Sequence, residues 1–402
     1  MQQLIFVLGR DNKISLAEIA CYFKVREIEF NIIAFNEDAA LIEFPRAIDA
    51  QKAINALGGT VKIAEVLCSA ESAKELQKGM QEGIDFGFFP KKFFYGVNDF
   101  SGGRHSALAE YALVFLKGKF KELKLKAVLK HARHERTEKG SRQINPSDVM
   151  KWDLIGKGLD LIFFSHGKEL FVGRSIACFD PFKLKERDEE RPCNKPLEAI
   201  SLRLARIMLN LSQANGEGCT VLDAFCGIAT IPMEALNNGL NAIGIEINPE
   251  TAVQARKNLE WYSKKFNAKN EWEIIEGDST KLSSFIKRNS FDQIVSEPHL
   301  GPLLKEFPSE EKARKIISGL EAIYSRFFNE AAKVMKFEKI ACIILPVIPS
   351  ASGKKFRVSE KVFLQNFVIY NPMPEIDPKA VPFPYSDRKN RIERLIYLLK
   401  KK

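Results

Sequence analysis

The stretch Val221–Asn248, which reads VLDAFCGIATIPMEALNNGLNAIGIEIN, decides the fold of this chain. Its first apolar run ends at Asp223 and predicts a strand, and a turn of small residues then leads into a predicted helix over Thr230–Asn238. A second apolar run predicts another strand and ends at Glu246. The sequence therefore predicts a strand, a turn, a helix and a strand, with a carboxylate at the end of each strand.

A unit of this kind binds ligands beyond the carboxyl ends of its strands, where the helix N-terminus presents free N–H groups. Glu246 follows Gly227 by 19 residues, which suits it to accept hydrogen bonds from a ribose diol. Dinucleotides and S-adenosylmethionine are both compatible with this arrangement. The turn lacks the G-x-G-x-x-G of dinucleotide sites, and Asp223 would repel a pyrophosphate but attract a cationic methionyl group. The residues favour S-adenosylmethionine, and an unliganded unit is the alternative.

The turn from Asp223 to Ala229 resembles the cofactor motif of class I S-adenosylmethionine-dependent methyltransferases. It departs from that motif only in Ala229, where a glycine is usual. The resemblance implies a Rossmann-like domain with S-adenosyl-L-methionine as its cofactor, and implies that an acid after the third strand bonds the adenine amine. The candidate cofactor-binding residues are Asp223, Phe225, Gly227, Ala229, Thr230, Glu246, Ile247, Asp278 and Ser279.

Length and composition limit the class of protein. A chain of 402 residues predicts two or three domains, and no apolar run is long enough to predict a membrane span. Seven Cys residues without C-x-x-C spacing argue against a disulfide framework and a structural zinc, so we expect no metal. Together with an N-terminus that lacks a secretory leader, they predict a cytoplasmic location. The formal net charge of +10 favours a polyanionic partner if the charge is clustered.

The positive charge does cluster in one segment. Between Lys117 and Arg142 there are ten Lys or Arg residues and three Glu residues. Lysine and arginine bind phosphates and release counterions, which predicts an RNA-binding surface, whereas a solvated helix face is the alternative. The candidate RNA-binding residues are Lys124, Lys126, Lys130, Arg133, Arg136 and Arg142.

The chain upstream of the cofactor unit divides into modules. Residues 1–70 show the order βαββαβ of a ferredoxin-like module, whose first helix is predicted to open at a capping box of Ser15 and Glu18. Residues 71–178 form a second module, and residues 179–198 read as a linker dense in charge and proline. Residues 199–402 then form the Rossmann-like domain.

The order of these segments is similar to that of the THUMP-containing tRNA guanine-N2 methyltransferases, which act on guanosine 10 of tRNA. The similarity is carried by LGRDNKISLAEIACYF near the N-terminus, VGRSIACFDPFKLKERDEERP after the middle module and SLRLARIMLNLS before the cofactor unit. It implies an α/β chain in which a Rossmann-like class I methyltransferase domain is preceded by an α+β ferredoxin-like module and a THUMP-like RNA-binding domain. The implied function is methylation of the exocyclic amine (N2) of a guanosine in tRNA.

The fourth predicted strand of that domain ends in SEPHLG, where amino-group methyltransferases carry (D/N/S)-P-P-(Y/F). In that motif a polar side chain and a backbone carbonyl hold the N–H groups of the amine while an aromatic ring stacks on the flipped base. Two alignments stay open: either Glu297 is the acceptor, or Ser296 is the acceptor and His299 the stacking ring. We favour Glu297, with Pro298 supplying the carbonyl and His299 touching the base.

Other functions stay open at the sequence level. One is a DNA or RNA adenine-N6 or cytosine-N4 amino-methyltransferase, which shares this type of turn. Another is an RNA-binding protein that holds S-adenosylmethionine with weak or no catalysis, which the altered turn would suit; a dinucleotide oxidoreductase is a distant further alternative. The sequence decides neither the target nucleotide, nor mono- versus dimethylation, nor the need for a small activator subunit; apart from that subunit we expect a monomer.

Overall fold

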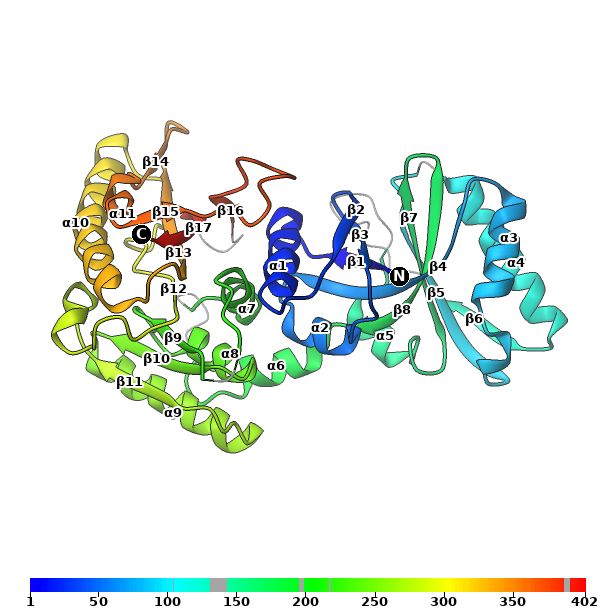
Figure 1. Ribbon diagram of the computed structural model, residues 1–402, viewed down its shortest axis with the longest axis horizontal. Helices are drawn as coiled ribbons and strands as arrows, with labels where there is room; N and C mark the ends of the chain where they lie inside the picture. Colours follow the sequence, from blue (N-terminus) through cyan, green and yellow to red (C-terminus); the bar gives the residue numbers. More distant parts are fainter. Residues whose placement is uncertain (104, 131–142, 195–198, 217, 387–390) are drawn as a thin grey trace. The chain divides into compact units, whose positions relative to one another are not determined.

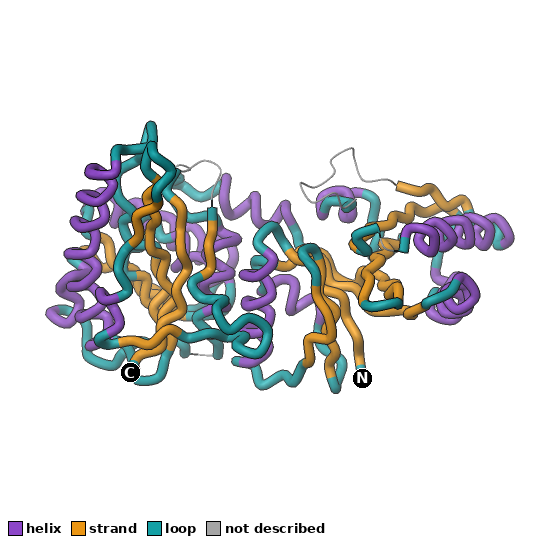
Figure 2. Tube along the Cα trace, turned by 90° about the horizontal axis from the view of Figure 1, so that it is seen from above, coloured by secondary structure: helices purple, strands orange, loops and turns teal. Residues whose placement is uncertain are grey.

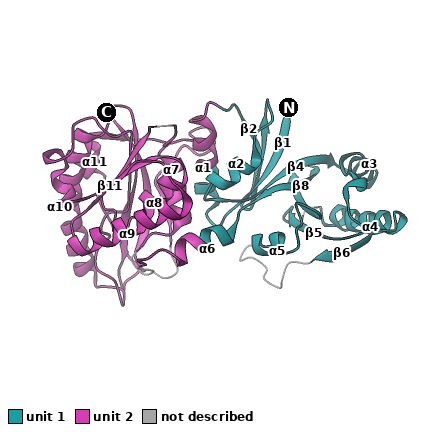
Figure 3. Cartoon of the chain, turned by 90° about the horizontal axis from the view of Figure 1, so that it is seen from below, with its two compact units in different colours: residues 1–16, 28–184 teal, residues 17–27, 185–402 magenta. Residues whose placement is uncertain are grey.

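The computed structural model describes residues 1–103, 105–130, 143–194, 199–216, 218–386 and 391–402. The chain separates into two units, coloured separately in Figure 3. The first comprises residues 1–16 and 28–184, and the second comprises residues 17–27 and 185–402. Among the described residues, no helix has both the length and the apolar character that a membrane crossing requires.

The first unit is built on a single sheet. Its strands are β1 (Gln2–Leu8), β2 (Asn31–Phe35), β3 (Ala39–Phe44), β4 (Thr60–Ala70), β5 (Lys92–Phe100), β6 (Lys126–Lys130), β7 (Leu159–His166) and β8 (Glu169–Cys178). They hydrogen-bond in the order β2-β3-β1-β4-β8-β7-β5-β6; among these described strands, only β5 pairs in parallel, with β6 and β7 (Figure 1). The expected module boundary at residue 70 falls at the end of β4, inside this sheet.

Helices of the first unit cover parts of this sheet. They are α2 (Ala50–Ala56), α3 (Ala73–Gly83), the 3-10 helix η1 (Phe86–Phe88), α4 (Ser106–Glu122) and α5 (Pro146–Lys151). Aromatic residues fill the core under α3 and α4, where the Phe89 and Phe93 rings stack at 4.5 Å and Phe120 meets Phe93 edge-on at 5.1 Å. Such aromatic contacts add to the area they bury and fix the helices on the sheet.

A buried charge pair joins four strands of this sheet. Lys62 on β4 donates to Asp160 on β7 at 2.9 Å and to Asn98 on β5 at 3.0 Å, and both side chains of the ion pair are fully buried. Ser175 on β8 donates to the same carboxylate at 2.6 Å. A buried pair of this kind holds its strands in register because the loss of one partner would leave the other charge buried and uncompensated.

The order βαββαβ predicted for residues 1–70 is observed, but the predicted capping box is wrong. Helix α1 (Asn12–Lys24) begins three residues before Ser15, whose hydroxyl donates instead to the Asp11 carbonyl at 2.9 Å. Glu18 is fully buried and accepts a hydrogen bond of 2.7 Å from the Asn210 amide. The acid therefore serves tertiary packing rather than a helix end, which a local pattern does not reveal.

The second unit is a doubly wound sheet of the Rossmann-like kind that the resemblance implies. Its main strands are β9 (Thr220–Asp223), β10 (Asn241–Glu246), β11 (Trp272–Glu276), β12 (Gln293–Ser296), β13 (Ile340–Pro349), β15 (Phe367–Ile369) and β17 (Glu393–Lys401). They lie in the order β11-β10-β9-β12-β13-β17-β15; the first five are parallel and β17 is antiparallel. Two short strands flank this path, β14 (Lys355–Arg357) on β13 and β16 (Phe383–Tyr385) on β17.

Helices pack on both faces of this second sheet (Figure 2). The helices of this unit are α7 (Leu202–Leu211), α8 (Thr230–Asn237), α9 (Pro249–Phe266), the 3-10 helix η2 (Ser279–Ser284), α10 (Glu310–Val334) and α11 (Lys361–Leu364). Helix α6 (Pro181–Glu189) begins in the first unit, and its Arg187 contacts α8. All ten residues of β13 are buried, as expected for a strand that is covered on both faces. Helix α10 buries an apolar stripe at helical spacing, which includes Ile317, Leu320, Tyr324 and Phe328.

The stretch 179–198 is structured in its described part. It contains α6, and the side chains of Arg187 and Arg191 are buried although arginine is mostly exposed in proteins. Both arginines contact α8, so the charged segment packs against the helix that follows the turn from Asp223 to Ala229, here called the cofactor turn.

Candidate cofactor and catalytic site

Polar residues end three neighbouring strands of the second sheet. Asp223 is the last residue of β9, Glu246 of β10 and Ser296 of β12. Because these strands are parallel, the three residues lie at the same edge of the sheet. The strand order reverses between β9 and β12, and this is where doubly wound sheets bind their ligands.

The turn after β9 brings backbone rather than side chains to this edge. Gly227 and Ala229 both adopt the left-handed conformation, with φ of 51° and 66°. Apart from its two chain neighbours, no heavy atom of the described residues would lie within 4 Å of a Cβ atom placed on Gly227, so the space in front of the turn is open on this side. Ala229 accepts this conformation with a methyl group, where the resemblance places a glycine, at a cost of about 1–2 kcal/mol. The turn thus has the open backbone surface that a methionyl group requires.

Glu246 is fixed by two backbone donors. One carboxylate oxygen accepts from the Gly227 N–H at 3.0 Å and the other from the Asn248 N–H at 2.8 Å. Each oxygen can accept a second hydrogen bond, so a ribose diol fits the chemistry of this carboxylate. Ile247 beside it is 68% exposed and offers an apolar surface at the same edge.

Asp223 is almost completely buried and its carboxylate joins two strands. It accepts hydrogen bonds from the Ser296 hydroxyl at 2.7 Å and the Phe225 N–H at 3.2 Å. Burial raises the pKa of Asp223 to about 7, and the nearby carboxylates of Glu246 and Glu297 add to the rise, which these hydrogen bonds oppose. A cation bound here would stabilise the ionised form, as expected for the cationic methionyl end of S-adenosylmethionine.

The turn after β11 supplies Asp278 and Ser279. Asp278 caps η2 and accepts from the Thr280 N–H at 2.9 Å and the Thr280 hydroxyl at 2.8 Å. Partial desolvation alone would raise the pKa of Asp278, but these hydrogen bonds outweigh it and the pKa is lowered. Ser279 is buried and donates to the Ala224 carbonyl, so its hydroxyl links the turn after β11 to the turn after β9.

The SEPHLG turn after β12 is held from two directions. The Glu297 carboxylate is 2.5 Å from Arg394 Nε of β17, and the two side chains are 10% and 9% exposed. Tyr324 of α10 donates from its hydroxyl to the His299 carbonyl at 2.6 Å. Pro298 is buried and His299 is exposed. The structure thus presents an oriented, ion-paired carboxylate beside the cofactor edge.

Ser296 has a different role in this geometry. Its hydroxyl donates to Asp223 and accepts from the Ala224 N–H at 2.7 Å, so it links β12 to the end of β9. The hydroxyl is therefore engaged within the protein, at the junction of β12 and the turn after β9. Sequence reasoning missed Arg394 and Tyr324. Arg394 follows Glu393 at the start of β17, ahead of the apolar run 395–399, and no local pattern distinguishes it from the other charged residues of this strand.

The described part of the basic segment spans two elements of the first unit. Lys124 precedes β6, the edge strand of the sheet, and Lys126 is its first residue; both are exposed. Lys130 is the last residue of that strand. The Lys130 ammonium lies 4.5 Å from the Phe94 ring centre and 4.9 Å from the Trp152 ring centre. The other candidate residues, Arg133, Arg136 and Arg142, lie outside the described residues. In the described ranges, no group of three or more His, Cys, Asp or Glu residues could hold a metal ion.

Two family models match this chain. One is described as RMKL-like, methyltransferase domain, and covers residues 189–350, which include β9–β12 and the SEPHLG turn. The other is described as DNA methylase and covers residues 59–257. Both descriptions are of methyltransferases, which agrees with the sequence-based choice of S-adenosylmethionine over a dinucleotide.

Two similar curated proteins are named tRNA (guanine(10)-N2)-dimethyltransferase. The Pyrococcus abyssi protein is 32% identical over 136 residues, which are 34% of this chain and 39% of that protein. The Methanothermobacter thermautotrophicus protein is 27% identical over 180 residues, 43% of this chain and 48% of that protein. The chain thus spans less than half of the length of either curated relative.

A solved structure extends the likeness of the fold to the whole chain. TrmN from Thermus thermophilus superposes with a TM-score of 0.56 at 13% identity, and the alignment covers 100% of both chains. At this identity the similarity establishes the fold alone.

Proposed function

We propose that this chain is an S-adenosylmethionine-dependent methyltransferase that acts on the exocyclic N2 of a guanosine in tRNA. The names of the two curated relatives and the two methyltransferase family matches support this proposal. The observation that carries it is the 2.7 Å hydrogen bond between Asp223 and Ser296, because it joins the cofactor turn to the SEPHLG turn at the edge where the strand order reverses.

The chemistry assigned to this edge is an in-line methyl transfer. S-adenosylmethionine bound at this edge would supply an electrophilic methyl group, and its sulfur would leave as a neutral thioether when the S–CH₃ bond is exchanged for the N–CH₃ bond. The guanine N2 lone pair is delocalised into the ring, so its N–H groups need an acceptor that restores electron density to nitrogen. Glu297 accepts these hydrogens and takes up the proton that the methylated amine releases. Asp223 and Glu246 hold the methionyl and ribose parts, so that the reacting atoms meet in one orientation.

An ionised Glu297 favours guanine over the other amino-bearing bases. Guanine presents two adjacent donors, N1–H and the N2 amine, whereas adenine and cytosine place a ring-nitrogen acceptor beside their amine. A carboxylate accepts from both guanine donors but is repelled by the lone pair of a ring nitrogen. Arg394 Nε donates to one Glu297 oxygen, and this ion pair fixes the carboxylate in place as an acceptor.

The first unit is proposed to hold the RNA. The strand order β2-β3-β1-β4 supports a ferredoxin-like module for residues 1–70, and a THUMP-like role for residues 71–178 is proposed on the resemblance. Lys124, Lys126 and Lys130 then supply phosphate contacts, together with the candidate arginines of the same segment. A cytoplasmic location, a monomeric state and a small activator subunit stay predictions.

Nucleoside mass spectrometry tests this function. Incubation of the protein with S-adenosylmethionine and unmodified tRNA should yield N2-methylated guanosine, and duplex DNA should not be methylated. Glu297→Gln should lower the methylation rate by roughly 10²–10⁴-fold, because the neutral amide neither accepts the proton nor pairs with both guanine donors. S-adenosylhomocysteine affinity should change by less than about threefold, because Glu297 acts on the base rather than on the cofactor.

Glu306→Gln is the matched control, since Glu306 is an exposed carboxylate in the loop that follows the SEPHLG turn. It should leave the rate unchanged. Methylation of adenine N6 or cytosine N4 would replace the proposed substrate. Cofactor binding without transfer to any RNA would instead support the reading as a cofactor-holding RNA-binding protein.

A further inference from the structure

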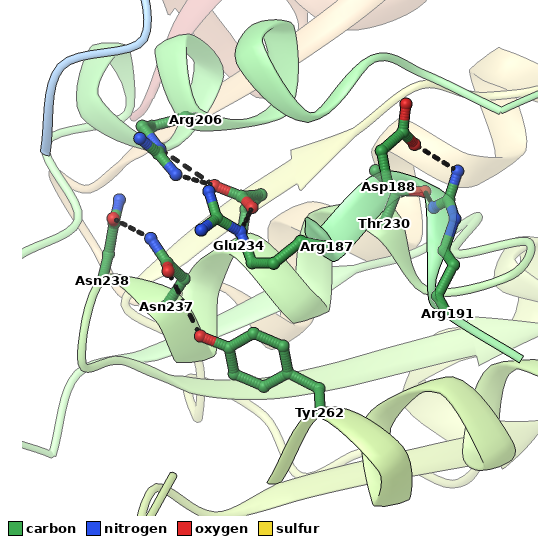
Figure 4. Close-up of polar contacts among 9 residues, drawn as sticks. All are labelled: Arg187, Asp188, Arg191, Arg206, Thr230, Glu234, Asn237, Asn238 and Tyr262. Atoms are coloured by element: carbon green, nitrogen blue, oxygen red, sulfur yellow. Dashed lines mark hydrogen bonds and ion pairs between the residues drawn. The ribbon is translucent and has the colours of Figure 1, made fainter. Parts of the chain in front are cut away.

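Three buried arginines surround the first turns of α8 (Figure 4). Two of them share one acid: Arg187 Nε donates to one oxygen of Glu234 at 2.9 Å, and Arg206 Nη2 donates to the other at 2.6 Å. Glu234 is fully buried, so both of its oxygens are compensated by a guanidinium. This group is explained as a structural ion-pair cluster that fixes α6 and α7 on α8.

Arg191 differs from these two arginines because it is incompletely satisfied. Its Nη1 donates to the Thr230 hydroxyl at 3.0 Å, and its Nη2 donates to Asp188 and Asn194, both at 2.9 Å. Its side chain is only 3% exposed. Among the residues that the structure describes, Arg191 Nε is buried without a hydrogen-bond partner. A buried unpaired donor on a cation is costly, and an anion bound next to this guanidinium would offset that cost.

The position of Arg191 indicates where that ligand would lie. Thr230 is the first residue of α8, directly after the cofactor turn. The residue at the N-cap position is Ala229, so no side chain caps the first N–H groups of this helix. An uncapped helix N-terminus carries partial positive charge and free donors. A guanidinium held against the same turn adds a full positive charge, and the combination suits a carboxylate.

We propose that Arg191, with Thr230 and the uncapped N-terminus of α8, binds the α-carboxylate at the methionyl end of the cofactor. This inference rests on the proposed function, since it assumes that S-adenosylmethionine binds at this edge. The residues at the two ends of the cofactor turn then carry charges opposite to those of the zwitterionic methionyl group. Asp223, before the turn, faces the cationic part, and Arg191, held at Thr230 after the turn, faces the anionic part. The part of the charged stretch around Arg191 is in this view part of the cofactor site.

Two ligands that differ in the amino-acid part distinguish this role from a purely structural one. S-adenosylhomocysteine carries the α-carboxylate, whereas 5′-methylthioadenosine has the adenosine and sulfur without the amino acid. By titration calorimetry, Arg191→Gln should weaken S-adenosylhomocysteine binding by about 10–100-fold, as expected for loss of a charge-assisted hydrogen bond. Binding of 5′-methylthioadenosine should change by less than about twofold. Arg191→Lys, which keeps the charge, should fall between wild type and Arg191→Gln.

Arg187→Gln is the matched control. Arg187 lies four residues earlier, is also buried and contacts α8, but its partner is Glu234 rather than the helix N-terminus. This variant should lower the melting temperature without changing the ratio of the two affinities. If Arg191→Gln does not fold, Arg191→Lys and Thr230→Val give the same comparison, and both should reduce the affinity ratio.

The outcomes separate this inference from the proposed function. Equal weakening of both ligands, or no weakening of either, in the Arg191 variants would show that Arg191 only anchors its segment, and would overturn the inference. Failure of the wild-type protein to bind S-adenosylhomocysteine would overturn the proposed function itself. The measurement needs no RNA substrate, so it does not depend on identifying the target nucleotide.

Discussion

At the scale of single residues, burial of Asp223 makes cofactor binding depend on pH. Its pKa of about 7 means that the carboxyl is mostly protonated below pH 6 and mostly ionised above pH 8. A cation binds the ionised form, so binding must displace a proton at acidic pH. Affinity for S-adenosylmethionine should therefore rise by roughly tenfold between pH 5.5 and 7.0. Calorimetry in buffers of different ionisation enthalpy should also detect the released proton.

Asp223→Asn is the control for this titration. The amide preserves the shape and one hydrogen-bond acceptor but does not ionise in this range. It should bind more weakly, with an affinity nearly constant over the same pH interval. A wild-type affinity that does not vary with pH would show that Asp223 does not face the cationic part of the cofactor.

Gly227 allows a second comparison at the residue scale, with Gly239 as its matched control. Both glycines have positive φ, 51° and 75°, and a Cβ on either would meet no heavy atom within 4 Å. Alanine at either position should therefore cost about 1–2 kcal/mol of unfolding free energy, which denaturant titration measures. Only Gly227 lies in the cofactor turn, so only Gly227→Ala should weaken S-adenosylhomocysteine binding. Equal affinities in the two variants would mean that the ligand does not approach this turn.

Some residues of the site were predictable from sequence because their positions follow from local order. Asp223 and Glu246 end strands on either side of a short helix, and parallel strands bring such ends together. Arg394 was not predictable because it reaches Glu297 across 97 positions, from a strand whose place in the sheet no local pattern reveals. Arg191 was hidden by composition, since charge and proline suggested a linker where the arginine side chain is buried.

At the scale of elements, α10 both covers the sheet and holds the SEPHLG turn. Tyr324 lies in its apolar stripe, and its hydroxyl is the donor that fixes the His299 carbonyl. Tyr324→Phe keeps the packing and removes this hydrogen bond, so the turn should lose part of its fixed orientation. Methylation of tRNA should slow by roughly fivefold, consistent with a loss of about 1 kcal/mol, while S-adenosylhomocysteine affinity stays within about twofold.

Tyr397→Phe is the corresponding control. Tyr397 is also a buried tyrosine of the second unit, and its hydroxyl donates to Glu360 at 3.3 Å rather than to the SEPHLG turn. Its loss should affect stability and leave the methylation rate unchanged. Equal rates for Tyr324→Phe and wild type would contradict a role for α10 in orienting the turn.

Element boundaries show where local patterns succeed and where they fail. The helix predicted over Thr230–Asn238 agrees with α8 (Thr230–Asn237) to within one residue, because its apolar spacing is helical and Gly239 follows its end. The start of α1 was wrong because Ser15 and Glu18 imitate a cap while Glu18 is buried as a partner of Asn210. The secondary structure of the basic segment was also not clear from its local pattern. Its described residues lie at the end of α4, in the edge strand β6 and in the short turn between them.

At the scale of the whole molecule, strand order was the least predictable feature. Residues 1–178 were expected to form two modules, but their strands join in one sheet in which β4 of the first pairs with β8 of the second. In the second unit, β17 lies between β13 and β15, although β15 precedes it in sequence. Pairings of this kind depend on long-range packing, so motif spacing identifies the site more readily than it identifies the sheet.

The charge of the whole molecule leads to a prediction about tRNA affinity. The net charge of +10 would favour any polyanion, but a specific RNA surface requires that particular lysines contact phosphates. Lys124→Gln with Lys126→Gln removes two exposed charges next to or on the edge strand β6. Filter binding should show about tenfold weaker tRNA affinity and a slope of log affinity against log salt that is smaller by roughly one to two units. Affinity for S-adenosylhomocysteine should be unchanged, because these lysines lie in the first unit and the cofactor turn in the second.

Lys74→Gln with Lys78→Gln removes the same charge from exposed positions of α3 in that first unit. If this control lowered affinity and salt slope as much as the β6 pair, net charge rather than a defined surface would account for RNA binding.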